Sequence, residues 1–146
     1  MFIRAKGKTK KIWFSMTPSQ ILSKGALVEA SSGKLIPATN TAKAHNIIGV
    51  YAGPAITATD SDYTTDRLVP VEVPVEKWVT WTGDVTVGTL ATTSVGAYFD
   101  LTTADTGDAV DQSSSTEDVV FCVKFITASK GEFVLNIGPE SVGDVT

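Results

Sequence analysis

The sequence predicts an all-β protein: one small single-domain β barrel or sandwich with an extended N-terminal arm. Of the 146 residues, 20 are threonine and 17 are valine, and both are β-branched residues that favour strands over helices. Short apolar runs recur about every ten residues, separated by glycine-rich turns, and no amphipathic helical pattern interrupts them. A chain of this length is expected to form one domain and to bury roughly 70% of its unfolded surface.

Residues 1–14 are expected to form a basic arm in front of a folded domain that spans residues 15–146. Residues 1–11 contain no acid and five bases, whereas the rest of the chain carries 16 acidic and seven basic side chains. The five bases are Arg4, Lys6, Lys8, Lys10 and Lys11. Because the arm alone has little apolar surface, we expect it to be disordered until it binds a partner, or to remain a solubilising tail.

Three apolar residues close the arm: Ile12, Trp13 and Phe14. Adjacent aromatic side chains need a surface to cover them. That surface is either the domain's own core, with these residues as its first strand, or a partner protein. The segment Thr17-Pro18-Ser19-Gln20 then fits a capping box with proline at the first helical position, which predicts about one turn of helix.

A β-hairpin is predicted next, with strands at residues 25–30 and 35–39. The turn between them reads Ser31-Ser32-Gly33-Lys34, in which Gly33 can take a positive φ. A polar link then leads to residues 47–52, an apolar run that predicts a buried strand. Gly49 within this run indicates close approach of a backbone or a bulky neighbour.

Residues 68–76 show the clearest period of two in the chain, after a polar loop at residues 55–67. Four valines share one face, while two prolines and two glutamates share the other. Because proline cannot donate a hydrogen bond to a ladder, we expect this to be an edge strand that the prolines protect from further pairing.

The second half of the chain is expected to form further short strands. They are predicted at residues 78–81, 98–101, 119–126 and 132–137, with turns in 84–97 and 128–131. The run 119–126 is apolar on both faces apart from Lys124, so it is expected to be central. The last residues are expected to form a tail.

No pattern of residues predicts an active site. His45 is the only histidine, and it lies in a polar link without a neighbouring acid, so a nucleophile system that depends on it is not expected. Ser31 and Lys34 match the S-x-x-K acyl-enzyme motif, but they lie in a hairpin turn instead of on a buried helix. The single cysteine, Cys122, excludes an intrachain disulfide, and its apolar setting predicts a buried thiol.

No metal, cofactor, nucleic acid or membrane is expected as a partner. Acidic residues gather at 60–66 and 105–111 without the spacing of an EF-hand, which favours solvated loops over a calcium site. The acidic body would repel a nucleic acid. No apolar run approaches the roughly 18–20 residues of a membrane helix, and the start of the chain lacks a signal-peptide core.

Residues 20–53 resemble a known family. The segment Q-I-L-S-K-G-A-L-V-E-A-S-S-G-K-L-I-P-A-T, followed by N-I-I-G-V-Y-A-G, resembles the core of the head decoration proteins of tailed bacteriophages, also called cement or head-stabilising proteins. The shared features are a glycine before an apolar strand, a Ser-Gly-Lys turn, a Pro-Ala step and a buried I-I-G-V run. The later order is similar too: a valine-rich strand, Gly-Thr turns, the run Y-F-D-L-T and a final hairpin.

The resemblance implies a virion structural protein with a β-tulip-like fold and no catalytic residues. Proteins of this family bind the outer surface of an icosahedral phage head, commonly as homotrimers at three-fold and quasi-three-fold sites, and clamp neighbouring major capsid subunits. Many add a strand to the capsid protein through an N-terminal segment. We therefore expect the capsid-binding residues to be Arg4, Lys6, Lys8, Lys10, Lys11, Ile12, Trp13 and Phe14. We expect synthesis in the host bacterial cytoplasm and a place on the virion surface.

Two other hypotheses belong to different classes of protein. A phage adhesin or carbohydrate-binding module displayed on the virion would show exposed aromatic side chains, for which Trp78 and Trp81 are the candidates. A small hydrolase would depend on His45.

Overall fold

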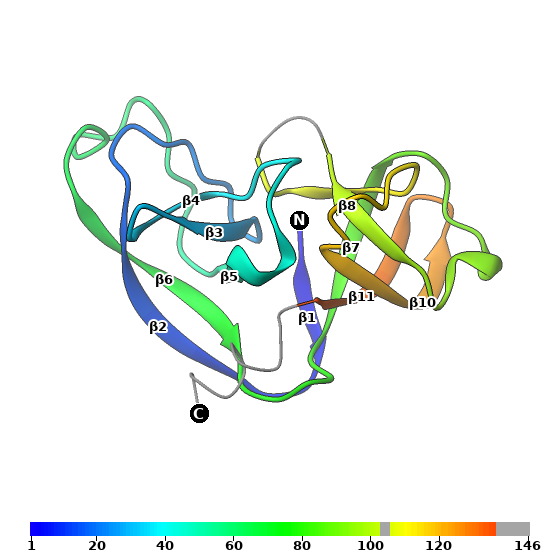
Figure 1. Cartoon of the computed structure of the whole chain (residues 1–146). Coiled ribbons are helices and arrows are strands. Elements are labelled where there is room, and N and C mark those ends of the chain that lie inside the picture. The colour runs from blue at the N-terminus through cyan, green and yellow to red at the C-terminus, as the bar shows by residue number, and fades with distance from the viewer. Residues whose placement is uncertain (103–105, 137–146) are drawn as a thin grey trace.

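The chain folds into two small closed β-sheets that lie side by side (Figure 1). The computed structural model describes residues 1–102 and 106–136. The first sheet is a five-stranded barrel in the order β2-β4-β3-β5-β6, with β2 (Thr9–Met16), β3 (Leu27–Ser31), β4 (Lys34–Pro37), β5 (Ile47–Tyr51) and β6 (Arg67–Pro74). The second has the order β1-β7-β11-β10-β8-β9, with β1 (Ile3–Lys6), β7 (Thr80–Val87), β8 (Tyr98–Leu101), β9 (Ala109–Asp111), β10 (Val120–Thr127) and β11 (Lys130–Leu135). Because β9 also pairs with β7, five strands of the second sheet close into a ring.

This architecture confirms the predicted all-β, barrel-like, single-domain fold. Helical structure among the described residues is limited to two short 3₁₀ turns, η1 (Ala44–Asn46) and η2 (Thr92–Ser94). Within residues 1–102 and 106–136, no helix has the length and apolar character needed to cross a membrane.

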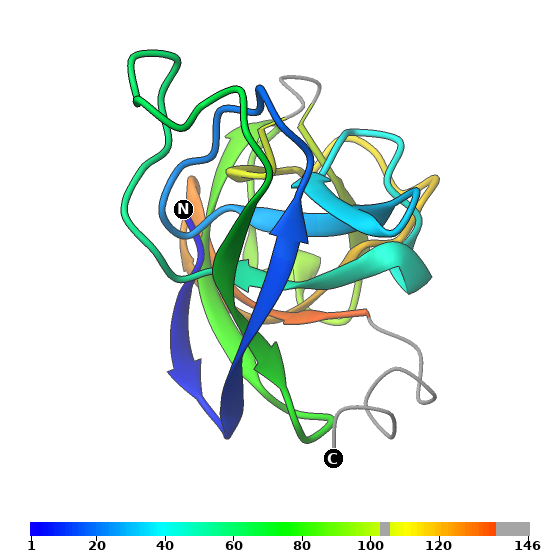
Figure 2. The ribbon, with the colours of Figure 1, turned by 90° about the vertical axis from the view of Figure 1, so that its left-hand side faces the viewer.

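The β2–β6 ladder is the longest of the first barrel, and Figure 2 shows these two strands running side by side. All eight residues of β2 have an antiparallel partner in β6, from Thr9 opposite Pro74 to Met16 opposite Arg67. The barrel closes where Met16 bridges Leu35 of β4 in parallel.

The predicted hairpin is confirmed as β3 and β4. Its turn residues Ser32 and Gly33 take φ values of 52° and 80°, the left-handed angles that match the twist of a two-residue hairpin loop. The predicted close approach at Gly49 is confirmed as well. A Cβ on Gly49 would lie 2.2 Å from the backbone carbonyl oxygen of Glu72 in the neighbouring strand β6.

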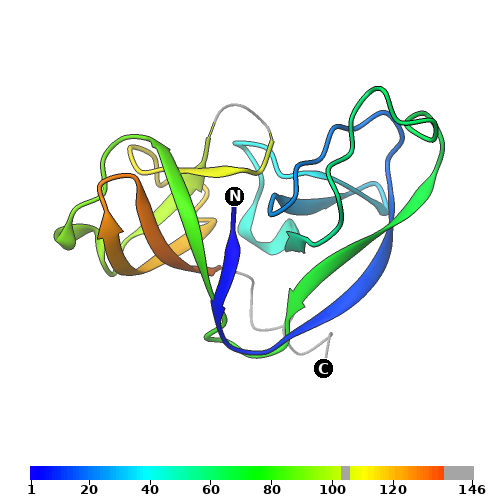
Figure 3. The same ribbon diagram turned by 180° about the vertical axis from the view of Figure 1, so that it is seen from behind.

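The first residues belong to the two sheets and do not form the expected free arm. Strand β1 pairs with β7 of the second sheet, Ile3 lying opposite Thr82, and Figure 3 shows the chain crossing from there to β2. Residues 9–14 are part of the β2–β6 ladder. The expectation of disorder was wrong because it omitted Phe2, whose side chain is 2% exposed and anchors β1 in the core.

Strand β6 is not an edge strand, because β2 pairs with it on one side and β5 on the other. The predicted valine face is confirmed: Val69, Val71 and Val73 are buried in the first barrel. The carbonyl oxygen of Pro70 accepts a hydrogen bond from the Ala52 N–H. Since the N and C=O of a residue in an antiparallel strand face the same side, the proline nitrogens turn towards β5. Strand β5 pairs only with Val71 and Glu72, so no ladder bond is lost.

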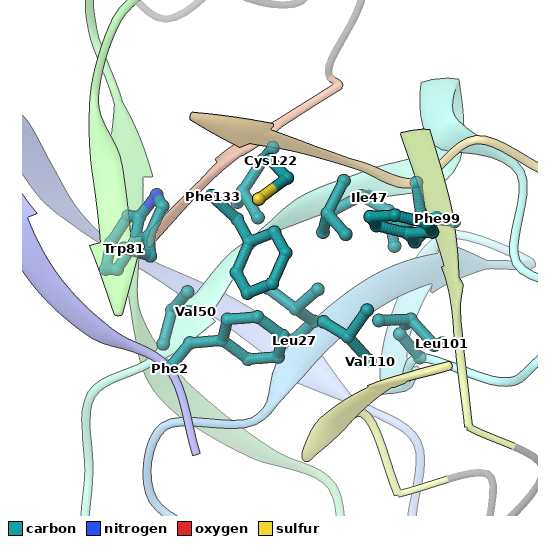
Figure 4. Packing of buried hydrophobic residues seen from close by; sticks show 14 of the residues in the cluster. Phe2, Leu27, Ile47, Val50, Trp81, Phe99, Leu101, Val110, Cys122 and Phe133 are labelled. Carbon is teal, nitrogen blue, oxygen red and sulfur yellow. The ribbon is translucent and has the colours of Figure 1, made fainter. Parts of the chain in front are cut away.

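Two clusters of apolar side chains hold the sheets together. One fills the first barrel, and it includes Met16, Leu22, Leu35 and Val71. The other joins the second sheet to the first barrel and is drawn in Figure 4, where Leu27, Ile47 and Val50 meet Phe2, Trp81, Val110 and Phe133. Because the second cluster takes residues from both sheets, the second sheet shares its core with the first barrel.

Three smaller expectations need correction or lie outside the described residues. Residues 17–20 form bends and no helical turn, because Ser19 takes a φ of 62° and its N–H donates to the Tyr63 carbonyl oxygen at 2.8 Å. The strand expected at residues 78–81 begins only at Thr80. The predicted central strand is confirmed as β10, between β8 and β11. Ile137, the tail after it and Asp105 lie outside the described residues.

Candidate functional site

Strands β1 and β2 and the bend between them carry all the predicted binding residues. The alternation of β2 divides its residues into two groups. Ile12 and Phe14 are half-buried and pack against the core of the first barrel. Lys11 and Trp13 alternate with them in sequence and are exposed, Trp13 by 59%. The alternative that residues 12–14 form the domain's own first strand is therefore the one that the structure shows, with only Trp13 free to contact a partner.

Arg4 is held by contacts within the chain. Its Nη1 donates to Thr9 Oγ1 at 3.1 Å, and its Nε lies 3.9 Å from Glu72 Oε2. Thr9 Oγ1 in turn donates to Glu72 Oε2 at 3.2 Å. The guanidinium thus links β1 to β2 and β6, so its charge is partly neutralised by Glu72.

The four predicted lysines lie at the bend between β1 and β2, and we call Lys6, Lys8, Lys10 and Lys11 the basic bend. All four are exposed, and within the described parts of the chain none of them takes part in an ion pair. Gly7 makes the bend with a φ of 94°. The Lys8 N–H donates to Glu76 Oε1 at 2.8 Å, which fixes the bend against the segment before β7.

A shallow hollow lies on the outer face of the β2–β6 ladder, and we call Trp13, Leu68 and Pro70 the Trp13 face. Trp13 is directly opposite Pro70 in the ladder, and Leu68, which is 61% exposed, is opposite Ser15. The rim of the hollow carries Arg67, Asp60 and Asp62. Arg67 forms ion pairs with both aspartates, so the charges at the rim compensate one another. The exposed apolar side chains are then the part of this hollow that can contact another protein.

The residues considered for catalysis and for metal binding have ordinary positions. His45 is exposed in η1, and Lys34 pairs with Asp66 at 2.7 Å in the hairpin turn instead of facing Ser31. Among residues 1–102 and 106–136, no group of three or more His, Cys, Asp or Glu side chains is arranged to hold a metal ion. Cys122 is buried as predicted, and burial raises the pKa of its thiol.

The two tryptophans proposed for glycan binding do not form a pair. Trp81 is 1% exposed and lies in the shared core, whereas Trp78 is 66% exposed. Trp78 instead lies beside Phe121 and Tyr98, on the outer surface of the second sheet. The half-buried position of Phe121 on the outer face could not be predicted, because residues 119–126 are apolar at almost every position and so have no period that marks an outer face.

The fold and these surfaces were compared with known proteins. Searches of protein-family models, of curated protein sequences and of solved structures find no match to this chain. The resemblance to head decoration proteins therefore stays a prediction that rests on the residues quoted above.

Proposed function

We propose that this chain is a virion structural protein that binds the outer surface of an icosahedral phage head and stabilises it by clamping neighbouring major capsid subunits. It acts without catalysis and is expected to work as a homotrimer at three-fold and quasi-three-fold sites. The support is the resemblance in residues 20–53, which form β3, β4, β5 and their links, together with the two surfaces on β1, β2 and β6.

The basic bend is the observation that carries this proposal. Its four exposed lysines have no ionic partner among the described residues, although the chain outside residues 1–11 has an excess of nine acids. An acidic partner surface would supply the missing counter-charges. The Trp13 face, on the same strand β2, adds apolar contact area of the kind that dominates binding free energy at protein interfaces.

Strand β1 offers a second mode of attachment next to these side chains. Among the described strands β1 pairs only with β7, so its other backbone edge is open, and all four of its residues are exposed. A strand of the capsid protein that adds to this edge would gain backbone hydrogen bonds. Many such contacts repeated over a closed lattice sum to tight attachment.

Charge reversal in the basic bend tests the proposal. We expect Lys8→Glu/Lys10→Glu to reduce cosedimentation with expanded heads, assembled from the major capsid protein of the same genome, by about tenfold or more. The matched control is Lys77→Glu/Lys124→Glu. It reverses the charge of two exposed lysines elsewhere, Lys77 in the turn before β7 and Lys124 in β10. If the first variant decorates heads as well as the unmodified chain, the basic bend is not the attachment site.

Truncation is not an adequate test, because residues 1–14 include β1 and most of β2. Removing them would open the first barrel and expose the shared core, so loss of binding would follow from unfolding. If the full-length, folded chain binds no head at all, the proposed function itself is wrong.

A further inference from the structure

A groove on the outer surface of the second sheet shares no lining residue with the basic bend or the Trp13 face. Three aromatic residues line it, Trp78, Tyr98 and Phe121, and its volume is about 260 Å³. Its polar lining consists of Glu76, Lys77 and Asn136. We call these six residues the aromatic groove.

Two of the three rings of the aromatic groove lie on strands of the second sheet, and the third, Trp78, lies in the turn just before β7. Phe121 of β10 is the cross-strand partner of Tyr98 in β8, and their ring centroids are 5.0 Å apart at an angle of 54°. Trp78 meets Phe121 edge to face, with centroids 6.5 Å apart and an angle of 68°. Rings inclined to one another in this way form a hollow with apolar walls.

The two outer rings remain accessible in spite of these contacts. Trp78 is 66% exposed, the largest exposed fraction among the large hydrophobic residues described, and Tyr98 is 42% exposed. Exposed aromatic residues gathered in one hollow mark a binding site more often than a chance feature of the surface.

Two of the three polar groups at the rim are held in place by hydrogen bonds to the backbone. Asn136 Nδ2 donates to the Asp118 carbonyl oxygen at 2.8 Å, which leaves the Asn136 side-chain oxygen as an acceptor. Glu76 Oε1 accepts the Lys8 N–H, which fixes that carboxylate. The ammonium of Lys77 supplies donors. A ligand in the groove therefore meets both donors and acceptors.

The charge and the strand pairing of the groove select one class of ligand. Glu76 and Lys77 carry opposite charges, so the rim favours a ligand without net charge. Strands β8 and β10 are each paired on both sides, so a polypeptide has no open backbone edge here to extend. A neutral sugar fits both conditions: the C–H face of a pyranose packs on the negative face of an aromatic ring, and its hydroxyl groups both donate and accept hydrogen bonds.

We propose that the aromatic groove binds a neutral oligosaccharide, with Trp78 and Tyr98 packing against sugar rings and Asn136, Glu76 and Lys77 bonding to hydroxyl groups. The volume lies just below the roughly 300–1,000 Å³ of pockets for drug-sized ligands, which suits one or two sugar rings. This activity is additional to head binding and would allow a decorated head to adhere to glycan-bearing surfaces, where many copies act together.

The test is a titration followed by tryptophan fluorescence and calorimetry. The probes are the neutral trisaccharides of glucose, galactose and N-acetylglucosamine, with trigalacturonate as the charged comparison. We expect at least one neutral trisaccharide to bind with a Kd below about 1 mM, and more tightly than trigalacturonate. Trp78→Ala should weaken that binding by about tenfold or more, because the indole is the largest contact surface in the groove.

The matched control is Trp13→Ala, which removes another exposed indole, on the first barrel, and should leave sugar binding unchanged. Both variants should keep the unfolding midpoint of the unmodified chain. The proposal is overturned if none of the neutral sugars binds, or if binding survives Trp78→Ala. It is also overturned if Trp78→Ala abolishes a concentration-dependent self-association, since a second copy of the chain would then be the occupant. Head binding by Trp78→Ala is measured separately, so failure here leaves the proposed function open to its own test.

Discussion

At the scale of single residues, one buried carboxylate organises a long loop. Asp100 is 3% exposed, and it accepts hydrogen bonds from Ser114 Oγ at 2.6 Å and from the backbone N–H groups of residues 116–118 at 2.7–2.9 Å. Burial alone would raise the pKa of Asp100, but these hydrogen bonds outweigh it and hold the pKa below its usual value. Asp100 is therefore a structural carboxylate that fixes the backbone of residues 116–118.

Replacement of that carboxylate is expected to destabilise the protein. Asp100→Asn should lower the free energy of unfolding by about 3 kcal/mol, because the new amide N–H₂ would face backbone donors. Because the pKa of Asp100 is lowered by folding, its stabilisation is present above the unfolded-state pKa near ~3.9 and is lost as the pH falls through the lower, folded-state value. Urea unfolding between pH 7 and pH 3 would measure both effects.

The control for Asp100 is an exposed acid. Asp66→Asn removes a carboxylate that is paired with Lys34 at the surface, and it should cost less than about 1 kcal/mol. Equal losses in the two variants would contradict a structural role for Asp100.

At the scale of elements, β1 decides whether the N-terminal segment is an arm or part of the domain. All four of its residues are exposed, and its sequence pattern alone predicts a charged tail. Its stability comes from its neighbours: Phe2 fills the shared core, the Phe2 N–H donates to the Gly25 carbonyl oxygen at 2.7 Å, and β7 supplies a ladder. The strand thereby ties the first barrel to the second sheet.

Removal of the Phe2 ring distinguishes a free N-terminal arm from a strand that belongs to the domain. Phe2→Ala should lower the free energy of unfolding by about 3–5 kcal/mol, as expected for a large cavity in a shared core. Ile3→Ala, next to it but 57% exposed, should change the free energy by less than about 0.5 kcal/mol. Guanidinium denaturation of both variants gives the comparison. If the segment were a free arm, the two substitutions would be equally harmless.

At the scale of the whole molecule, charge and apolar surface are distributed unevenly. Four of the lysines without an ionic partner among the described residues gather at the basic bend, while the proposed sugar site lies on the second sheet. An interface built on exposed lysines is screened by salt, because the Debye length shortens from about 10 Å at 0.1 M to about 3 Å at 1 M. Contacts of Trp13 and its neighbours are apolar and do not weaken in this way.

Salt dependence of head binding should therefore differ between variants. Between 0.1 M and 0.5 M NaCl, the affinity of the unmodified chain for expanded heads should fall by about tenfold. The slope of affinity against salt should be shallower for Lys8→Glu/Lys10→Glu, whereas Trp13→Ala should weaken binding at both concentrations and keep the slope. Cosedimentation at several salt concentrations supplies the measurement, and a salt-independent affinity for the unmodified chain would contradict an electrostatic interface.

Local patterns predicted those parts of the fold whose causes are local. The Ser32-Gly33 turn, the buried run with Gly49, the alternating valines of β6 and the β10–β11 hairpin all follow from conformational preference and period. Of the candidate site, the exposure of the lysines was predictable, because charged side chains are seldom buried without partners. The sequence left open whether Ile12 and Phe14 face the core, because burial in a core and burial against a partner protein both need apolar side chains.

The sequence by itself determined that this protein is all-β, has one domain and carries an excess of basic residues near its start, because composition, period and charge are properties of neighbouring residues. Only the tertiary structure decided that β1 and β2 belong to the two sheets, that β6 lies between β2 and β5, and that Trp81 is buried while Trp78 lines a groove with Phe121. The physical reason is that these outcomes depend on which strands pair across the two sheets. Long-range pairing is selected by the free energy of the whole core, and no short segment contains that information.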